Sequence, residues 1–123
     1  MKAREVMQEY INWERERWKM HRREVEYFDI GKGDEALYLR VLSSNEDFPC
    51  ILYASYDGNH PAFICKQSKT LRWVVSRWMG VYILAWVTTF EGIYRDLEYL
   101  GLANAVDKAK LEKAIFMAKL KMA

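Results

Sequence analysis

The sequence predicts an α+β fold, and three observations carry the prediction. Apolar residues recur at spacings of three and four near both ends of the chain, which is typical of amphipathic helices. Three short stretches between residues 37 and 67 are rich in strand-forming residues and are separated by turn residues. The longest apolar-rich run covers residues 68–100. We therefore expect an N-terminal helix, a three-stranded antiparallel meander, a long apolar helix and a C-terminal helix packed on the sheet.

The first helix is predicted over residues 3–28. Its apolar residues form two rows at seven-residue spacing, and together these rows cover a wide arc of the helix. Such an arc is wider than one contact face requires, so part of it is expected to meet a second surface, either another element or another copy of the chain. The longer row consists of Val6, Trp13, Met20 and Tyr27.

Two glycines at positions 31 and 33 predict a turn after this helix, and three strands are expected at residues 37–42, 50–55 and 62–67. The segment 56–61, Tyr-Asp-Gly-Asn-His-Pro, is a strong hairpin signal between the last two. This pairing would bring Cys50 close to Cys65, and we expect both to be free thiols.

The run at residues 68–100 fits either one helix or two strands. A glycine at position 80 and several β-branched residues favour two strands: Val74, Val75, Val81, Ile83, Val87, Thr88 and Thr89. Four charged residues, however, fall within one narrow sector of a helical wheel: Arg77, Glu91, Arg95 and Glu98. Ser68 is a suitable N-cap, and Gly101 follows the run where helices often end in a left-handed residue. We therefore predict one helix, kinked near Gly80.

This run does not predict a membrane span. Only residues 78–90 are free of charge, and Arg77 and Glu91 close the stretch on both sides. A bilayer span needs about 20 predominantly apolar residues. A buried core helix or an interfacial contact fits better.

The last helix, predicted over residues 102–121, is apolar on two sides. One side carries Leu102, Val106, Phe116, Met117 and Leu120, and Leu111, Ile115 and Met122 lie nearly opposite. A helix apolar on two sides contacts two surfaces, and a partner chain is the simplest second one. The expected interface residues are therefore Trp13, Met20, Tyr27, Leu111, Ile115 and Met122.

Length and composition indicate one soluble domain, residues 1–123. Hydrophobic residues make up 51% and charged residues 29% of the chain, unlike a disordered protein. A net charge of +2 is too small to indicate a polyanionic partner by itself. The charged N-terminal segment lacks the apolar region of a signal peptide, so we expect a cytoplasmic location.

No set of residues predicts catalysis, a cofactor or a metal. The cysteine and histidine spacings resemble neither CxxC nor HxxxH. Glu14 and His21 lie seven apart within the apolar arc of the first helix, and a carboxylate that orients an imidazole is a general-base arrangement. A small enzyme that uses this pair is therefore kept as an alternative, and it requires that both side chains share one pocket.

Nucleic-acid binding is the other alternative. Basic residues interleave with aromatic ones in the first helix, a pattern suited to phosphates and stacked bases. The residues concerned are Arg15, Arg17, Trp18, Lys19, Arg22 and Arg23. The order helix, three strands, helix is similar to that of the double-stranded-RNA-binding domain. Residues 68–78 lack the basic, alanine-rich helix start of that family, so the chain is not assigned to it.

The leading hypothesis combines these observations. Two helices offer more apolar surface than one small core uses, and no residues converge into a catalytic set. We therefore expect a non-catalytic interaction module that acts through protein contacts and forms a homodimer.

Overall fold

The computed structural model describes residues 3–22, 24–42, 47–56 and 73–122, and it confirms the α+β class. Its elements are α1 (Ala3–Met20), β1 (Val25–Asp29), β2 (Leu37–Leu42), β3 (Cys50–Tyr56), β4 (Trp73–Trp78), β5 (Val81–Thr88), α3 (Ile93–Tyr99) and α4 (Lys108–Met122).

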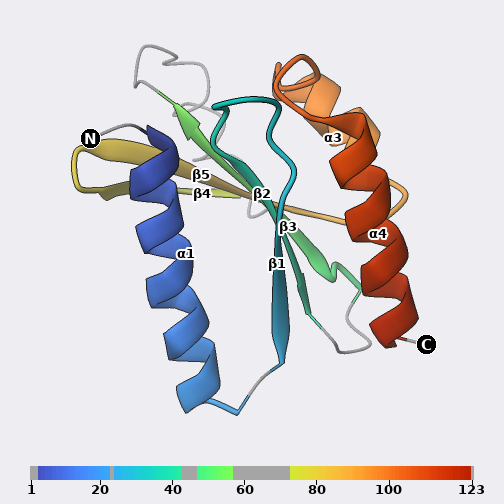
Figure 1. Ribbon diagram of the computed structural model, residues 1–123, viewed down its shortest axis with the longest axis horizontal. Helices are drawn as coiled ribbons and strands as arrows, with labels where there is room; N and C mark the ends of the chain where they lie inside the picture. Colours follow the sequence, from blue (N-terminus) through green and yellow to red (C-terminus); the bar gives the residue numbers. More distant parts are fainter. Residues whose placement is uncertain (1–2, 23, 43–46, 57–72, 123) are drawn as a thin grey trace.

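The five strands form one sheet in the order β1-β2-β3-β5-β4, and all neighbouring strands are antiparallel. Helix α1 covers one face of this sheet, and α3 and α4 cover the other (Figure 1). The molecule therefore has three layers, and its central strands are covered on both sides.

The face under α3 and α4 is mainly aliphatic. Side chains from β2, β3 and β5 pack there against both helices, and the fully buried members include Leu39, Leu52, Ile93, Leu97 and Leu111. The face under α1 is smaller and rich in aromatic rings, with Met7 and Ile11 of the helix packed on Tyr38, Tyr53 and Ile83.

The first helix is shorter than predicted. It ends at Met20, and Arg22 adopts a left-handed φ of 53° that stops further helical turns. Residues 25–29, predicted as helix, form β1 and pair with β2. Val25, Tyr27 and Phe28 are strand formers, but Val25 and Tyr27 follow the apolar residues Trp18 and Met20 of α1 by seven positions, and this spacing concealed the change.

The predicted long helix is wrong. Within residues 68–100, the described part contains β4, β5 and the short helix α3, while residues 68–72 lie outside the described residues. Met79 and Gly80 form a two-residue hairpin turn in which both φ angles are positive, 49° and 85°. That geometry is typical of a type I′ turn, and Trp78 pairs with Val81 across it.

Of the two predicted partners of the strand at 50–55, the strand at 37–42 is confirmed and the strand at 62–67 is wrong. β3 is hydrogen-bonded to β2 on one side and to β5 on the other. The predicted strand 62–67, with Cys65, lies outside the described residues, and so does the loop at 57–61. Cys50 is a free, buried thiol, and burial is the main cause that raises its pKa to about 12.

Residues at the end of α3 and at the start of α4 explain where these two helices end and begin. Gly101 has a φ of 74°, so α3 ends in the predicted left-handed glycine. The N–H of Gly101 donates to the carbonyl oxygen of Glu98, and the N–H of Leu102 donates to that of Leu97. The predicted helix over 102–121 begins later, at Lys108. The Asp107 carboxylate caps it by accepting hydrogen bonds from the N–H groups of Ala109 and Lys110, at 3.0 and 3.2 Å. No helix in the described parts of the chain is both long and apolar enough to cross a bilayer.

Candidate functional site

A buried carboxylate lies between α1 and the sheet. Glu14 faces inward from the third turn of α1, and only 7% of its surface is exposed. Its Oε1 atom accepts hydrogen bonds from Tyr53 Oη at 2.5 Å, Tyr27 Oη at 2.8 Å, Arg40 Nη1 at 3.3 Å and Trp18 Nε1 at 3.3 Å. These donors come from β3, β1, β2 and α1, so one oxygen atom connects the helix to three strands.

These interactions keep Glu14 ionised. Burial alone raises the pKa of a carboxyl group, but the hydrogen bonds from Tyr53 and Tyr27 and the charge of Arg40 outweigh it, so the pKa of Glu14 is lowered. Burial, with the negative charge of Glu14 as a further cause, raises the pKa of both Tyr27 and Tyr53. Both phenols therefore stay protonated and remain hydrogen-bond donors.

Arg40 is the buried counter-charge. Only 8% of its surface is exposed, and it pairs with Glu14 at 3.3 Å. Its guanidinium carbon lies 5.3 Å from the ring centroid of Trp18. An isolated buried charge is costly, and pairing with a carboxylate and an aromatic face offsets that cost.

A pocket of about 540 Å³ opens beside this cluster. Aromatic rings make most of its wall, and Tyr10, Trp13 and Trp78 contact one another with centroid distances of 5.3 to 5.9 Å. The lining residues are Tyr10, Trp13, Glu14, Arg17, Trp18, His21, Arg40, Tyr53, Trp78 and Ala85.

Glu14 and His21 thus line the same pocket, as the enzyme alternative requires. The chemistry of Glu14 does not suit a general base, because its pKa is lowered and its Oε1 already accepts hydrogen bonds from four side chains. Within the described residues, no three His, Cys, Asp or Glu side chains lie close enough to hold a metal ion.

The residues predicted for nucleic-acid binding lie along α1 and just after it, but their aromatic partners are occupied. Trp18 donates to Glu14, the Arg15 guanidinium lies 5.3 Å from the Tyr27 centroid, and Arg17 lies 5.5 Å from the Trp13 centroid. Lys19 pairs with Glu16.

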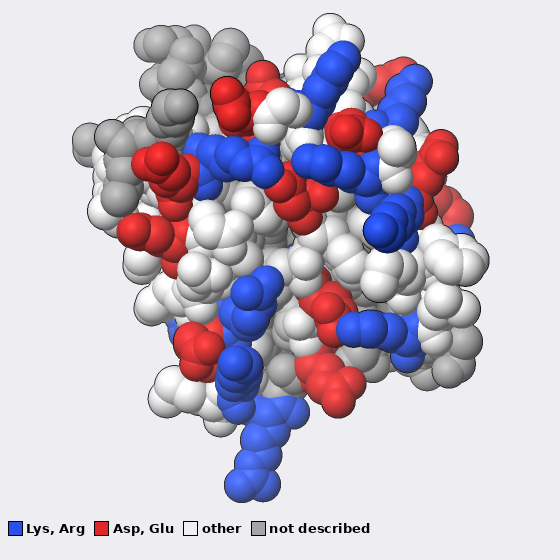
Figure 2. Space-filling view, viewed as in Figure 1, with Lys and Arg blue, Asp and Glu red and all other residues white. Residues whose placement is uncertain are grey.

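Arg22 is exposed, and Arg23 lies outside the described residues. Figure 2 shows acidic and basic side chains interspersed over this view, with a short column of basic side chains toward the lower end of α1.

The predicted interface residues divide into exposed and buried groups. Met20 is 83% exposed and Trp13 is 43% exposed. Tyr27 is half-buried on β1 and bonded to Glu14, whereas Leu111 is fully buried under α4 and Ile115 packs beside it. The side chain of Met122 is outside the described part. The exposed apolar residues of α4 are Phe116, Met117 and Leu120, which the helical wheel had assigned to the opposite side.

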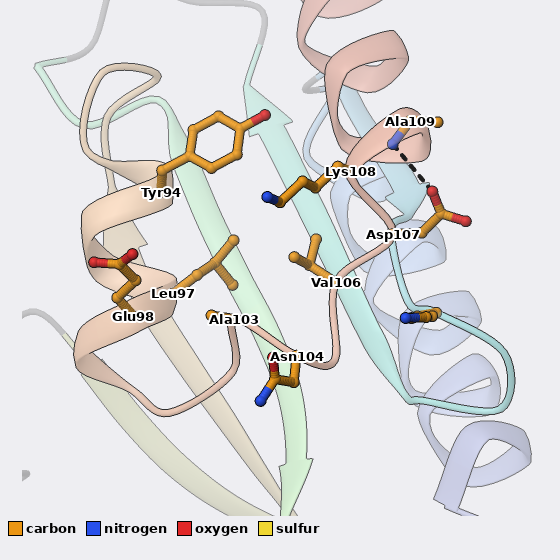
Figure 3. A pocket seen from close by; sticks show the side chains of 10 residues that line it. Tyr94, Leu97, Glu98, Ala103, Asn104, Val106, Asp107, Lys108 and Ala109 are labelled. Atoms are coloured by element: carbon orange, nitrogen blue, oxygen red, sulfur yellow. Dashed lines mark hydrogen bonds between the residues drawn. The ribbon is translucent and has the colours of Figure 1, made fainter.

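A second hollow of about 570 Å³ lies between α3 and the start of α4 (Figure 3). Tyr94, Leu97 and Glu98 of α3 line one side, and the remaining lining residues are Lys32, Ala103, Asn104 and residues 106–109. Its Asp107 carboxylate is used to cap α4. The aromatic pocket under α1 is therefore the better candidate site, because it combines buried charge with a defined aromatic wall.

Sequence reasoning found Glu14 and missed Arg40, Tyr53 and Trp78. One signal was present, since Glu14 stands within an apolar helical arc and Arg40 stands within the apolar strand Leu37–Leu42. Two opposite charges, each on an otherwise buried face, indicate a buried ion pair. Comparison of the chain with models of protein families, with curated proteins and with solved structures gives no match.

Proposed function

We propose that the protein is a non-catalytic interaction module and that it pairs with a second copy of itself through α4. The observation that carries this proposal is the exposed apolar stripe of α4: Phe116 is 65%, Leu120 62% and Met117 41% exposed. Residues 116 and 120 are one helical turn apart and therefore lie on the same side of the helix. Contiguous exposed apolar surface of this kind marks protein contact sites.

The lysines beside the stripe support a second copy as its partner. Lys110 donates to the Gly31 carbonyl oxygen, Lys119 lies over the ring of Phe90, and Lys121 pairs with Glu26. These three of the five lysines of α4 are held against their own chain, which lowers like-charge repulsion at the stripe, whereas the exposed Lys113 lies on the same side of the helix as the stripe. In an antiparallel pair of α4 helices, Phe116 of each copy would contact Leu120 of the other, which is the self-complementary contact of a two-fold interface.

Light scattering of the full chain at micromolar concentration tests the proposal. We expect twice the monomer mass of 14.7 kDa. Leu120→Glu places a buried charge in the interface and is expected to raise the dimer dissociation constant at least tenfold. Met20→Glu is the matched control, because Met20 is also exposed and apolar but lies on α1. A wild-type monomer would overturn the proposal, and so would a dimer that Met20→Glu disrupts and Leu120→Glu leaves intact.

A further inference from the structure

The aromatic pocket under α1 has an uncompensated positive charge. Its lining contains two arginines and one carboxylate, Glu14, and Glu14 is paired with Arg40. The other arginine, Arg17, makes no ion pair in the described parts of the chain and contacts only the ring of Trp13. His21 adds a further hydrogen-bonding group to the lining. The pocket is therefore suited to a ligand that brings a negative charge.

The aromatic side chains of the pocket favour a flat apolar group next to the negative charge of the ligand, and they disfavour a cation. A ligand cation would sit on the ring face of a tryptophan. The guanidinium group of Arg17 already lies over the ring of Trp13, and that of Arg40 lies over the ring of Trp18. Tyr10, Trp13 and Trp78 still offer flat apolar surface, and a volume of about 540 Å³ is in the range of small-molecule sites.

We propose that this pocket binds a carboxylate carried on a flat apolar group. The carboxylate would face the exposed guanidinium group of Arg17, and the apolar group would pack against Tyr10 and Trp13. The negative charge of Glu14 does not oppose this binding, because Arg40 neutralises it and four donors surround its Oε1. The carboxylate could come from a free aromatic acid or from an aromatic residue at the C-terminus of a peptide. This proposal does not depend on self-association, since α4 lies on the other side of the sheet (Figure 1).

The test titrates the full chain with three probes of nearly equal shape and follows the indole N–H signals of its five tryptophans by NMR. N-acetyltryptophan carries a carboxylate, N-acetyltryptophan amide is neutral, and tryptamine is a cation. We expect the carboxylate to bind at least tenfold more tightly than the amide and tryptamine not to bind. Equal affinity for carboxylate and amide, or preference for tryptamine, would overturn the proposal.

Substitutions then locate the site. Arg17→Ala is expected to weaken N-acetyltryptophan binding at least fivefold and to leave the amide unaffected. Lys19→Ala is the matched control: it removes the same charge two residues further along α1, where Lys19 pairs with Glu16 and does not line the pocket. If Arg17→Ala and Lys19→Ala weaken N-acetyltryptophan binding equally, the ligand is attracted by the overall positive charge of α1 and not by a defined site. That result would contradict the proposal.

A fourth probe, a hexapeptide that ends in tryptophan with a free carboxylate, distinguishes the two sources. Tighter binding of this peptide than of N-acetyltryptophan would support the proposal and assign the site to chain ends. Binding of N-acetyltryptophan alone would support it and assign the site to small aromatic acids.

Discussion

The two faces of the sheet use the same five strands for different chemistry. On β2, Leu39 points to the aliphatic layer under α3 and α4, whereas its neighbour Arg40 points to Glu14 under α1. The aliphatic layer is held by burial of apolar surface, which has no preferred direction. The layer under α1 depends on directional hydrogen bonds, four of which end on one carboxylate oxygen of Glu14, while Tyr38 donates another to Gln8. The first layer therefore tolerates small shifts, whereas the second fixes the position of α1 on the sheet.

The largest effect is expected from Glu14→Ala. It leaves Arg40 buried without its counter-charge and leaves the hydroxyls of Tyr27 and Tyr53 without their acceptor. Loss of one partner of a buried ion pair typically costs about 3–5 kcal/mol. Urea unfolding followed by circular dichroism measures the loss.

The double variant Glu14→Ala/Arg40→Met checks the cause of this loss. If the unpaired charge dominates, the double variant is more stable than Glu14→Ala alone although it lacks more contacts. A double variant less stable than Glu14→Ala would show that the hydrogen bonds and packing of Arg40 dominate instead.

On the aliphatic face, Leu111→Ala is expected to cost about 2–5 kcal/mol, because Leu111 is fully buried and its removal leaves a cavity between α4 and the sheet. The same urea experiment at pH 4 and at pH 7 should give the same difference, since no charge is involved. Met20→Ala, at a position that is 83% exposed at the end of α1, is the control and is expected to change stability by less than about 0.5 kcal/mol. A strong pH dependence for Leu111→Ala would contradict the division between the two faces.

The same comparison explains which parts of the fold the sequence predicts. β2 and most of β3 were predicted correctly, as were the existence of α1 and α4 and the left-handed end of α3 at Gly101. These elements have local signals: glycines, turn residues and apolar periodicity. The predicted long helix failed because β5 is covered on both faces. Ile83 is buried on the α1 side and Leu84 on the α4 side, so the strand is apolar at successive positions and shows no period of two.

The candidate site was only partly predictable for a different reason. Glu14 was identified because a charge within an apolar arc is unusual. Its partners Arg40, Tyr27 and Tyr53 come from three strands whose order depends on long-range pairing. Tyr27 was placed on the first helix, and an error of this kind in one element changes every contact of its side chains. Local patterns therefore indicate that a polar group is buried, but only the sheet order identifies its partners.

The smallest effect, and the sharpest distinction between the two faces, is expected from Glu14→Gln. Glutamine keeps the shape of the side chain and one acceptor oxygen but removes the charge, so we expect a loss of about 1–3 kcal/mol at pH 7. Because the pKa of Glu14 is lower in the folded protein than its ordinary value of 4.5, the ionised carboxylate contributes its full stabilisation above pH 4.5.

As the pH falls below that value, the unfolded chain takes up the proton first and the contribution declines. Urea unfolding at pH 7, 5, 4 and 3 should therefore give a constant difference between wild type and Glu14→Gln down to about pH 5 and a shrinking difference below pH 4.5. Glu112→Gln, on the exposed side of α4, controls for the loss of one negative charge. If the difference in unfolding free energy between wild type and Glu14→Gln stays constant down to pH 3, the charge of Glu14 does not stabilise the contact between α1 and the sheet. The hydrogen bonds to its acceptor oxygen would then account for the contribution of Glu14 to that contact.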